Sequence, residues 1–220
     1  MSSLFPIFLK LDGKRCLVVG AGKVGEAKIA GLIQTGARVH VVALQASQAV
    51  HEWAKAGKIV LELRAYVPAD FEGASLAVIA TSNPQLNKSI YQEAQRRGIL
   101  CNVVDVPEYC DFYYPAVVRR GDLQIAISTN GQSPSLAQKL RQQLERQFGL
   151  GYARWIAELG ATRNLILASD LDAKRKSELL HSLASREALE AALREKTQKE
   201  VSKEDALKQE FVEDDRRVMV

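Results

Sequence analysis

The feature that most constrains the fold is a glycine-rich segment near the start of the 220-residue chain. Residues 20–25 read Gly-Ala-Gly-Lys-Val-Gly and match the pattern G-x-G-x-x-G. The preceding run, Cys16-Leu17-Val18-Val19, is typical of a strand buried on both faces, and the pattern that follows is that of a helix ending at Gly36. This context predicts the first βαβ unit of a dinucleotide-binding domain.

Each glycine of this segment has its own expected structural role. Gly20 permits the tight turn, Gly22 lets the backbone approach a pyrophosphate, and Gly25 lets helix and strand pack closely. The backbone N–H groups of Lys23 and Val24 are expected to hold the pyrophosphate at the start of the helix. A glycine-rich turn without a ligand is the alternative.

The acidic residue that usually holds the ribose of a dinucleotide is missing about 20 residues further on. The strand expected at 38–43 is followed by Leu44 and Gln45, and no arginine comes directly after them to hold a 2′-phosphate. The side chain of Gln45 and the backbone of Leu44 are the expected contacts there. This spacing leaves the choice between NAD and NADP open.

Strands and helices alternate along the first half of the chain, which predicts a parallel sheet covered on both faces. The expected fold class is therefore α/β, a Rossmann-type doubly wound sheet. A short strand is also expected at Leu4–Leu9, followed by a two-residue turn at Asp12-Gly13. Further strands are expected at 38–43, 59–63, 76–80 and 99–104, and helices at 47–56 and 84–97.

The pattern changes after Asp105. Two antiparallel strands are expected around residues 117–118 and 123–127, then a helix from Ser133 to about Phe148, then further helices to the end. Residues 170–220 carry a net charge of −2 and no Gly or Pro, whereas residues 1–169 carry +6. These shifts predict a dinucleotide-binding domain at 1–113, a small region at 114–149 and a helical C-terminal domain at 150–220.

Polar residues follow the last two strands of the expected sheet, at the edge where doubly wound sheets bind ligands. Asp105 stands just past the strand that contains Asn102, and its carboxylate there can take a proton or hold a substrate N–H. A turn residue before Pro107 is the equally weighted alternative. Thr81 and Asn83 follow the preceding strand, where they either face the cofactor or cap the next helix.

A second polar loop precedes the helix expected at 133–148. Its hydroxyl groups and the N–H groups at the helix start can bind substrate carboxylates. The alternative is that the hydroxyl groups only cap the helix. The candidate substrate-binding residues are Asn102 from the sheet and, from this loop, Ser128, Thr129, Asn130, Gly131 and Ser133.

Composition excludes several classes of protein. Three Cys and three His without metal-ligand spacing predict neither a metal site nor a disulfide framework, and no apolar run is long enough to span a membrane. The chain contains no basic run with interleaved aromatic residues, so the sequence gives no indication of nucleic-acid binding. The start of the chain does not read as a signal peptide, so a soluble cytoplasmic protein is expected.

Several strings together resemble the precorrin-2 dehydrogenase family, whose members are stand-alone dehydrogenases and the front portion of sirohaem synthases. The resemblance covers roughly residues 3–150. It is carried by Phe5-Pro6-Ile7-Phe8-Leu9, Cys16-Leu17-Val18-Val19-Gly20-Ala21-Gly22, Ala80-Thr81 with Asn87, Asn102-Val103-Val104-Asp105, and Gly131-Gln132-Ser133-Pro134-Ser135-Leu136-Ala137.

The resemblance implies NAD-dependent oxidation of precorrin-2 to sirohydrochlorin, by a homodimer with a dimerisation region at 114–149. It implies that Lys23, Val24, Leu44 and Gln45 line the NAD and that Asp105 is the functional aspartate. Thr129 departs from the Ser that close relatives often carry. The methyltransferase domain of the fused enzymes has no room in 220 residues.

The front region's net charge of +6 suits a substrate with many carboxylates. Two alternatives to the dehydrogenase alone stay open. In one, the chain also inserts Fe²⁺ into sirohydrochlorin, as some family members do. In the other, it is a dinucleotide-sensing module without turnover, because such modules share the glycine-rich βαβ unit.

Overall fold

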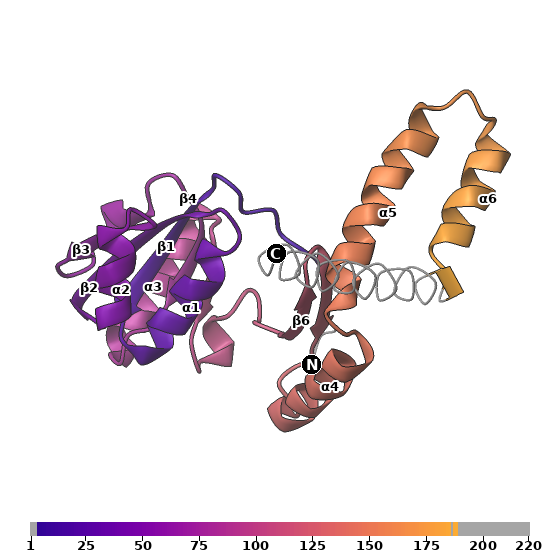
Figure 1. The fold of residues 1–220 in the computed structure, drawn as a ribbon. Coiled ribbons are helices and arrows are strands. Elements are labelled where there is room, and N and C mark those ends of the chain that lie inside the picture. Colours follow the sequence, from indigo (N-terminus) through magenta and orange to yellow (C-terminus); the bar gives the residue numbers. More distant parts are fainter. Residues whose placement is uncertain (1–3, 186, 189–220) are drawn as a thin grey trace, which may run out of the picture. The chain divides into compact units, whose positions relative to one another are not determined.

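The computed structural model describes residues 4–185 and 187–188, in two compact units that meet at the Tyr114–Pro115 bond (Figure 1). The first unit is a parallel sheet with helices on both faces, and the second holds a β-hairpin and helices. The expected fold class, a Rossmann-type α/β sheet followed by a helical region, is confirmed. The finer division into a dimerisation region and a helical domain stays a prediction.

The sheet of the first unit has five parallel strands in the order β3-β2-β1-β4-β5. The chain runs outward from the central β1 first to one side and then to the other, so the crossover direction reverses between β1 and β4. Ligands bind beyond the carboxyl ends of the strands at such a switch point. The strands are β1 (Arg15–Ala21), β2 (Arg38–Ala46), β3 (Ile59–Leu63), β4 (Ala74–Ile79) and β5 (Leu100–Val103).

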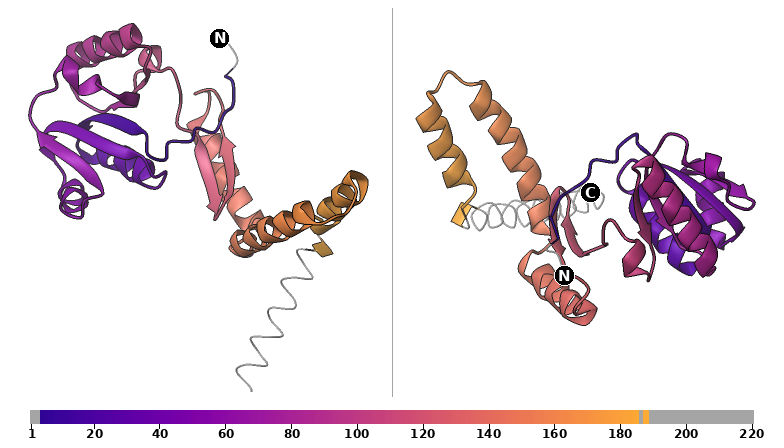
Figure 2. Two further views of the ribbon diagram at one scale, coloured as in Figure 1. Left: turned by 90° about the horizontal axis from the view of Figure 1, so that it is seen from above. Right: turned by 180° about the vertical axis from the view of Figure 1, so that it is seen from behind.

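Alternating residues of β1 pack into two separate cores, which is why this strand is apolar at consecutive positions. Cys16 and Val18 contact the helices α1 (Lys23–Ile33) and α2 (Gln48–Lys55), whereas Leu17 and Val19 face the helix α3 (Pro84–Arg97). Figure 2 shows this three-layer arrangement from two further directions. The two cores hold the carboxyl ends of β1, β4 and β5 in a fixed relation.

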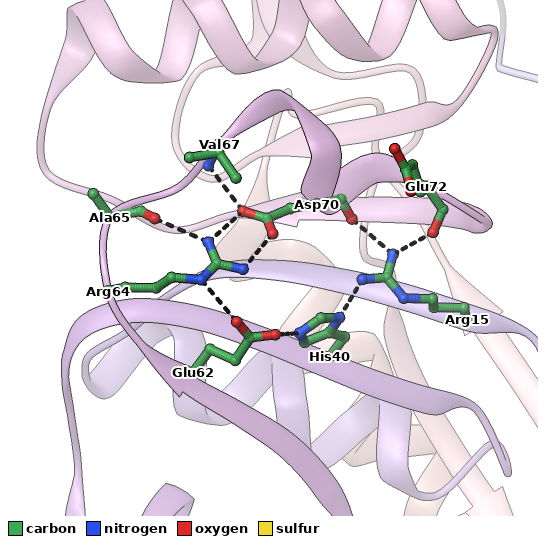
Figure 3. Close-up of polar contacts among 8 residues, drawn as sticks. All are labelled: Arg15, His40, Glu62, Arg64, Ala65, Val67, Asp70 and Glu72. Atoms are coloured by element: carbon green, nitrogen blue, oxygen red, sulfur yellow. Dashed lines mark hydrogen bonds and ion pairs between the residues drawn. The ribbon is translucent and has the colours of Figure 1, made fainter.

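The crossover from β3 to β4 contains only a short 3₁₀ turn, η1 (Pro68–Phe71), in place of a full helix. A polar network lies on the sheet beside it (Figure 3). His40 lies between Arg15 and Glu62, and Arg64 joins Glu62 to Asp70 through contacts of 2.7 and 2.5 Å. The network satisfies the carboxylate of Asp70, which is 5% exposed.

The second unit begins with an antiparallel hairpin of β6 (Ala116–Arg120) and β7 (Leu123–Ile127), as the sequence predicts. It continues with α4 (Pro134–Gln147), α5 (Gly151–Ala168) and α6 (Ala173–Leu183). Figure 2 shows α5 and α6 side by side, joined by a short turn. Arg120 donates to the carbonyls of Phe148 and Glu145, which ties the hairpin to the end of α4. The helices expected beyond residue 188 lie outside the described residues.

One local expectation was wrong. Leu4–Leu9 forms no strand, and Phe5 is 85% exposed; Pro6 removes one backbone donor, and no neighbouring strand pairs with this segment in the described residues. His40, to which the sequence assigns no role, is bonded on both sides of its ring. Its partners come from β1 and β3, so only the sheet register brings them together.

Candidate active site

The turn from β1 to α1 is as tight as the sequence predicts. Gly20 has a φ of +99°, and a Cβ built on it would lie 2.5 Å from the carbonyl oxygen of Ala80. A Cβ on Gly25 would run into the carbonyl of Gly20. Both glycines are therefore required by the protein itself, because the turn packs against the end of β4 and against its own helix.

Gly22 differs from both, because a Cβ built on it would meet no protein atom within 4 Å. It is the N-cap of α1, has a φ of −74° and supplies no side-chain cap, so the first N–H groups of the helix, including those of Lys23 and Val24, have no capping side chain. Open space beside uncapped helix N–H groups is what a pyrophosphate requires. These residues therefore fit the dinucleotide expected here.

The end of β2 lies beside this turn. Ser47, which caps α2, donates its backbone N–H to the carbonyl of Ala21 at 3.0 Å. Leu44 is 76% exposed and Gln45 is exposed next to it, so both are available to a ribose. The structure thus places Leu44 and Gln45 at the same sheet edge as the glycine turn.

The residues after β4 serve mainly to shape the edge. Asn83 accepts the backbone N–H of Leu86 at 3.0 Å and is the N-cap of α3. Thr81 donates its hydroxyl to the side-chain oxygen of Asn87 at 2.5 Å, and the Asn87 amide donates to the Thr81 carbonyl at 3.1 Å. Asn87 is 5% exposed, so this pair fixes the backbone of Thr81 beside Gly20.

Asp105 follows β5 in a turn with a φ of +62°, which few residues other than Gly, Asn and Asp adopt. Its side chain is exposed and makes no hydrogen bond or ion pair within the described part of the chain. The backbone of Val104 is held by a 2.9 Å bond to Ile79, so the turn starts at a fixed point. The sequence left a turn residue and a proton-handling group as alternatives; the structure combines an Asp-tolerant turn with an unpaired carboxylate.

Asn102 lies below this edge rather than on it. Its side chain is buried, and its amide donates to the carbonyl of Phe112 at 2.8 Å and to the sulfur of Cys110 at 3.3 Å. Asp111 bonds back to the N–H of Cys101 at 2.8 Å. These bonds fold the segment after β5 onto the sheet, and a direct contact of Asn102 with substrate stays a prediction.

The thiols are not reactive groups. Burial raises the pKa of Cys16 to about 11 and that of Cys101 to about 12, so both stay neutral at physiological pH. No group of three or more His, Cys, Asp or Glu residues capable of holding a metal ion occurs in residues 4–185 and 187–188.

The polar loop of the second unit is built around the start of α4. Ser133 accepts the N–H of Leu136 at 3.2 Å as the N-cap, and Thr129 accepts the N–H of Ser133 at 3.1 Å. Ser128 accepts the N–H of Asn130, which has a φ of +52°. The hydroxyl oxygens thus shape the loop, whereas its role toward a substrate stays a prediction.

Sequence reasoning missed Lys28 of α1. Its ammonium nitrogen lies 3.8 Å from the ring centroid of Tyr114. Burial lowers the pKa of Lys28, and the negative charge of Asp105 acts in the opposite direction. A lysine within an amphipathic helix gives no sequence signal for this, because Tyr114 and Asp105 come from segments more than 70 residues away.

Comparison with known proteins follows the same division of the chain. A family model described as "Putative NAD(P)-binding" matches residues 7–116, and one described as "Sirohaem biosynthesis protein central" matches residues 120–147. A solved structure titled "SirC, precorrin-2 dehydrogenase" superposes with a TM-score of 0.73 at 27% identity, over 84% of this chain and 92% of that one. The chain belongs to the putative NAD(P)-binding family that the first of these models describes. Its first unit is a dinucleotide-binding domain.

Curated siroheme synthases align with the front of the chain. Siroheme synthase of Nitrosococcus oceani is 40% identical over 149 residues, or 68% of this chain and 32% of that protein. Siroheme synthase of Methylococcus capsulatus is 41% identical over 140 residues, or 64% of this chain and 30% of that protein. The chain spans about a third of the length of these relatives. In the portion that the structure describes, no helix is long and apolar enough to cross a membrane.

Proposed function

We propose that this family member oxidises precorrin-2 to sirohydrochlorin with NAD as the hydride acceptor. The observation that carries the proposal is the unpaired carboxylate of Asp105, which follows β5 at the sheet edge that also holds the glycine turn. An acceptor for a hydride and an acceptor for a proton are the two things that this oxidation needs.

The chain's own residues have distinct parts in the reaction. The N–H groups at the start of α1 hold the pyrophosphate, and the open face of Gly22 lets it approach. The bound nicotinamide supplies the hydride acceptor. The Asp105 carboxylate takes the proton released from the substrate, or holds a pyrrole N–H in place, and Thr81 keeps the neighbouring edge in shape through Asn87.

The preference for NAD over NADP is part of the proposal. A 2′-phosphate is usually met by a basic side chain just after β2, and residues 44–48 read Leu-Gln-Ala-Ser-Gln. Gln45 is exposed at that edge and can donate to or accept from ribose hydroxyls. We therefore expect the cofactor without the additional phosphate to bind more tightly.

The loop 128–133 is proposed to meet the carboxylates of the tetrapyrrole. The backbone N–H groups at the start of α4 attract anions, and Ser133 and Thr129 order the loop around them. By its resemblance to precorrin-2 dehydrogenases the protein is further proposed to act as a homodimer. Sedimentation of the purified chain tests that assembly directly.

The experiment that tests the function is an anaerobic assay of purified protein with precorrin-2, comparing NAD with NADP and following the reduced nicotinamide. We expect turnover that is faster with NAD. The Asp105→Asn variant should lose at least about a hundred-fold in turnover, because asparagine tolerates the same backbone but takes no proton.

Glu108→Gln is the matched control, since it removes an exposed carboxylate only three residues away. Asp105→Asn with unchanged turnover would remove the assigned proton acceptor. Tight binding of NAD without turnover by the wild type would instead favour a sensing module.

A further inference from the structure

The start of α2 lies directly beside the glycine turn. Ala46 of β2 pairs in register with Ala21 of β1, and the N–H of Ser47 donates to the Ala21 carbonyl at 3.0 Å. Gln48, the first residue of the helix, follows and is exposed. A dinucleotide whose pyrophosphate rests on the glycine turn places its adenosine ribose by the end of β2. The first turn of α2 therefore lies close to the position of a 2′-phosphate.

Glu52 brings a carboxylate to this first turn from further along the helix. It stands four residues after Gln48, on the same face of α2, and helix side chains lean toward the N-terminus of their helix. The side-chain amide of Gln48 donates to Oε1 of Glu52 at 2.9 Å. This hydrogen bond holds the negative charge over the start of α2, although its residue lies one turn further on.

No ion pair neutralises the charge of Glu52 within residues 4–185 and 187–188. Its side chain is exposed, and so is Lys55, which lies at the other end of the helix. A negative charge near a helix N-terminus is favourable, so the helix itself stabilises the carboxylate there. The start of α2 thus presents the protein's own anion at a place where an unoccupied helix start attracts phosphate.

The acidic residue that usually follows β2 is missing from this chain, and Leu44 and Gln45 occupy its place. We propose that Glu52 supplies the missing negative charge from α2 and determines the cofactor specificity. Its carboxylate, positioned by Gln48, repels the 2′-phosphate of NADP, whereas NAD carries an uncharged hydroxyl at that position. This inference rests on the proposed function, because it assigns a residue to the preference for NAD.

The test measures the dissociation constants of oxidised NAD and oxidised NADP by calorimetry at low salt, without substrate. Glu52→Gln keeps the length of the side chain and an oxygen that accepts from Gln48, but removes the charge. We expect it to bind NADP at least about three-fold more tightly than the wild type, with NAD binding within about two-fold. Gln48→Met releases the carboxylate and should shift NADP binding in the same direction by a smaller factor.

Glu72→Gln is the matched control. It removes an exposed carboxylate that follows η1 and precedes β4, at the opposite edge of the sheet from the glycine turn, and both dissociation constants should stay unchanged. The gain of Glu52→Gln should shrink as the salt concentration rises, because salt screens exposed charges. Wild-type NADP binding in Glu52→Gln, or a gain independent of salt, would overturn the proposal. Wild-type NADP binding in Gln48→Met would overturn the positioning by Gln48.

Binding without turnover separates this inference from the proposed function. A wild type that binds NAD but does not oxidise precorrin-2 would overturn the proposed reaction alone. The comparison of Glu52→Gln with Glu72→Gln stays valid in that case, because it measures only how the charge of Glu52 affects the binding of NADP. A wild type that binds neither dinucleotide would overturn both proposals.

Discussion

Gly20 lies so close to Ala80 that a methyl group on it would approach the Ala80 carbonyl oxygen to 2.5 Å. This contact joins the carboxyl end of β1 to the residue that follows β4, and the crossover direction reverses between these two strands. The turn is therefore held from the side of the sheet as well as by its own helix. Gly22, two residues later, has no such neighbour.

Gly20→Ala should destabilise the protein. The substitution combines a clash with backbone atoms and a φ of +99°, which an L side chain rarely adopts, so we expect a loss of about 3 kcal/mol or more in the free energy of unfolding. Urea denaturation followed by circular dichroism measures it. A loss below about 1 kcal/mol would mean that the turn relaxes away from Ala80.

Gly22→Ala should leave stability nearly unchanged but weaken NAD binding. Its φ of −74° suits alanine and the added methyl group meets no protein atom, so stability should stay within about 1 kcal/mol of the wild type. The methyl group occupies the space where a pyrophosphate would approach, and the dissociation constant for NAD should rise by at least about ten-fold. Unchanged binding by calorimetry would place the dinucleotide elsewhere.

The difference between these glycines shows how far sequence reasoning reaches. The pattern G-x-G-x-x-G predicts a tight turn at Gly20, close approach of a ligand at Gly22 and close helix packing at Gly25. The close contacts of Gly20 and Gly25 and the open space beside Gly22 agree with these roles. The bounds of β3 and α3 match the prediction to the residue, because Gly and Pro punctuate these segments clearly. Such turns and element boundaries are determined by residues that are neighbours in the sequence, and the sequence alone therefore predicts them.

Side-chain contacts that depend on how the strands pair could not be predicted from the sequence. His40 has no partner within 15 residues along the chain, yet it bonds to β1 and β3 neighbours once the sheet forms. Lys28 meets Tyr114 only after the segment following β5 folds back. The strand expected at Leu4–Leu9 does not form for a related reason, because a short apolar run gives no information on whether a pairing strand is present.

Asp70→Asn tests the polar network beside η1. Burial acts to raise the pKa of Asp70, but the Arg64 guanidinium and the N–H of Val67 outweigh it, so that the pKa lies below its usual value. The folded state thus favours the charged form, and the stabilisation is present at neutral pH and lost as the pH falls through the lowered pKa. We expect Asp70→Asn to cost about 2 kcal/mol at neutral pH.

The pH dependence distinguishes this ion pair from a simple packing change. The gap in unfolding free energy between the wild type and Asp70→Asn should narrow as the pH falls from about 4, where the carboxylate of the unfolded chain takes up its proton, through the lowered pKa of the folded state. Glu72→Gln is the control, because that exposed residue offers only its backbone carbonyl to Arg15. A gap that is constant with pH would exclude the charge of Asp70 as its origin.

Variants of Ser133 distinguish the two interpretations of the loop before α4, namely binding of substrate carboxylates and capping of the helix. Its hydroxyl oxygen already accepts the N–H of Leu136, so the structure uses it as a cap. Ser133→Asp keeps that acceptor and adds a negative charge at the helix start, which leaves stability near that of the wild type. If the tetrapyrrole carboxylates meet this helix start, the added charge repels them, and KM for precorrin-2 should rise by about ten-fold or more.

Two companion variants make the Ser133 result specific. Ser133→Ala should lose about 1 kcal/mol of unfolding free energy through the missing cap, with a much smaller change in KM than Ser133→Asp. Gln143→Glu adds the same charge to an exposed position of α4 more than two turns away, and its KM should equal that of the wild type. Equal KM values for Ser133→Asp and Gln143→Glu would show that the substrate carboxylates bind away from the start of α4.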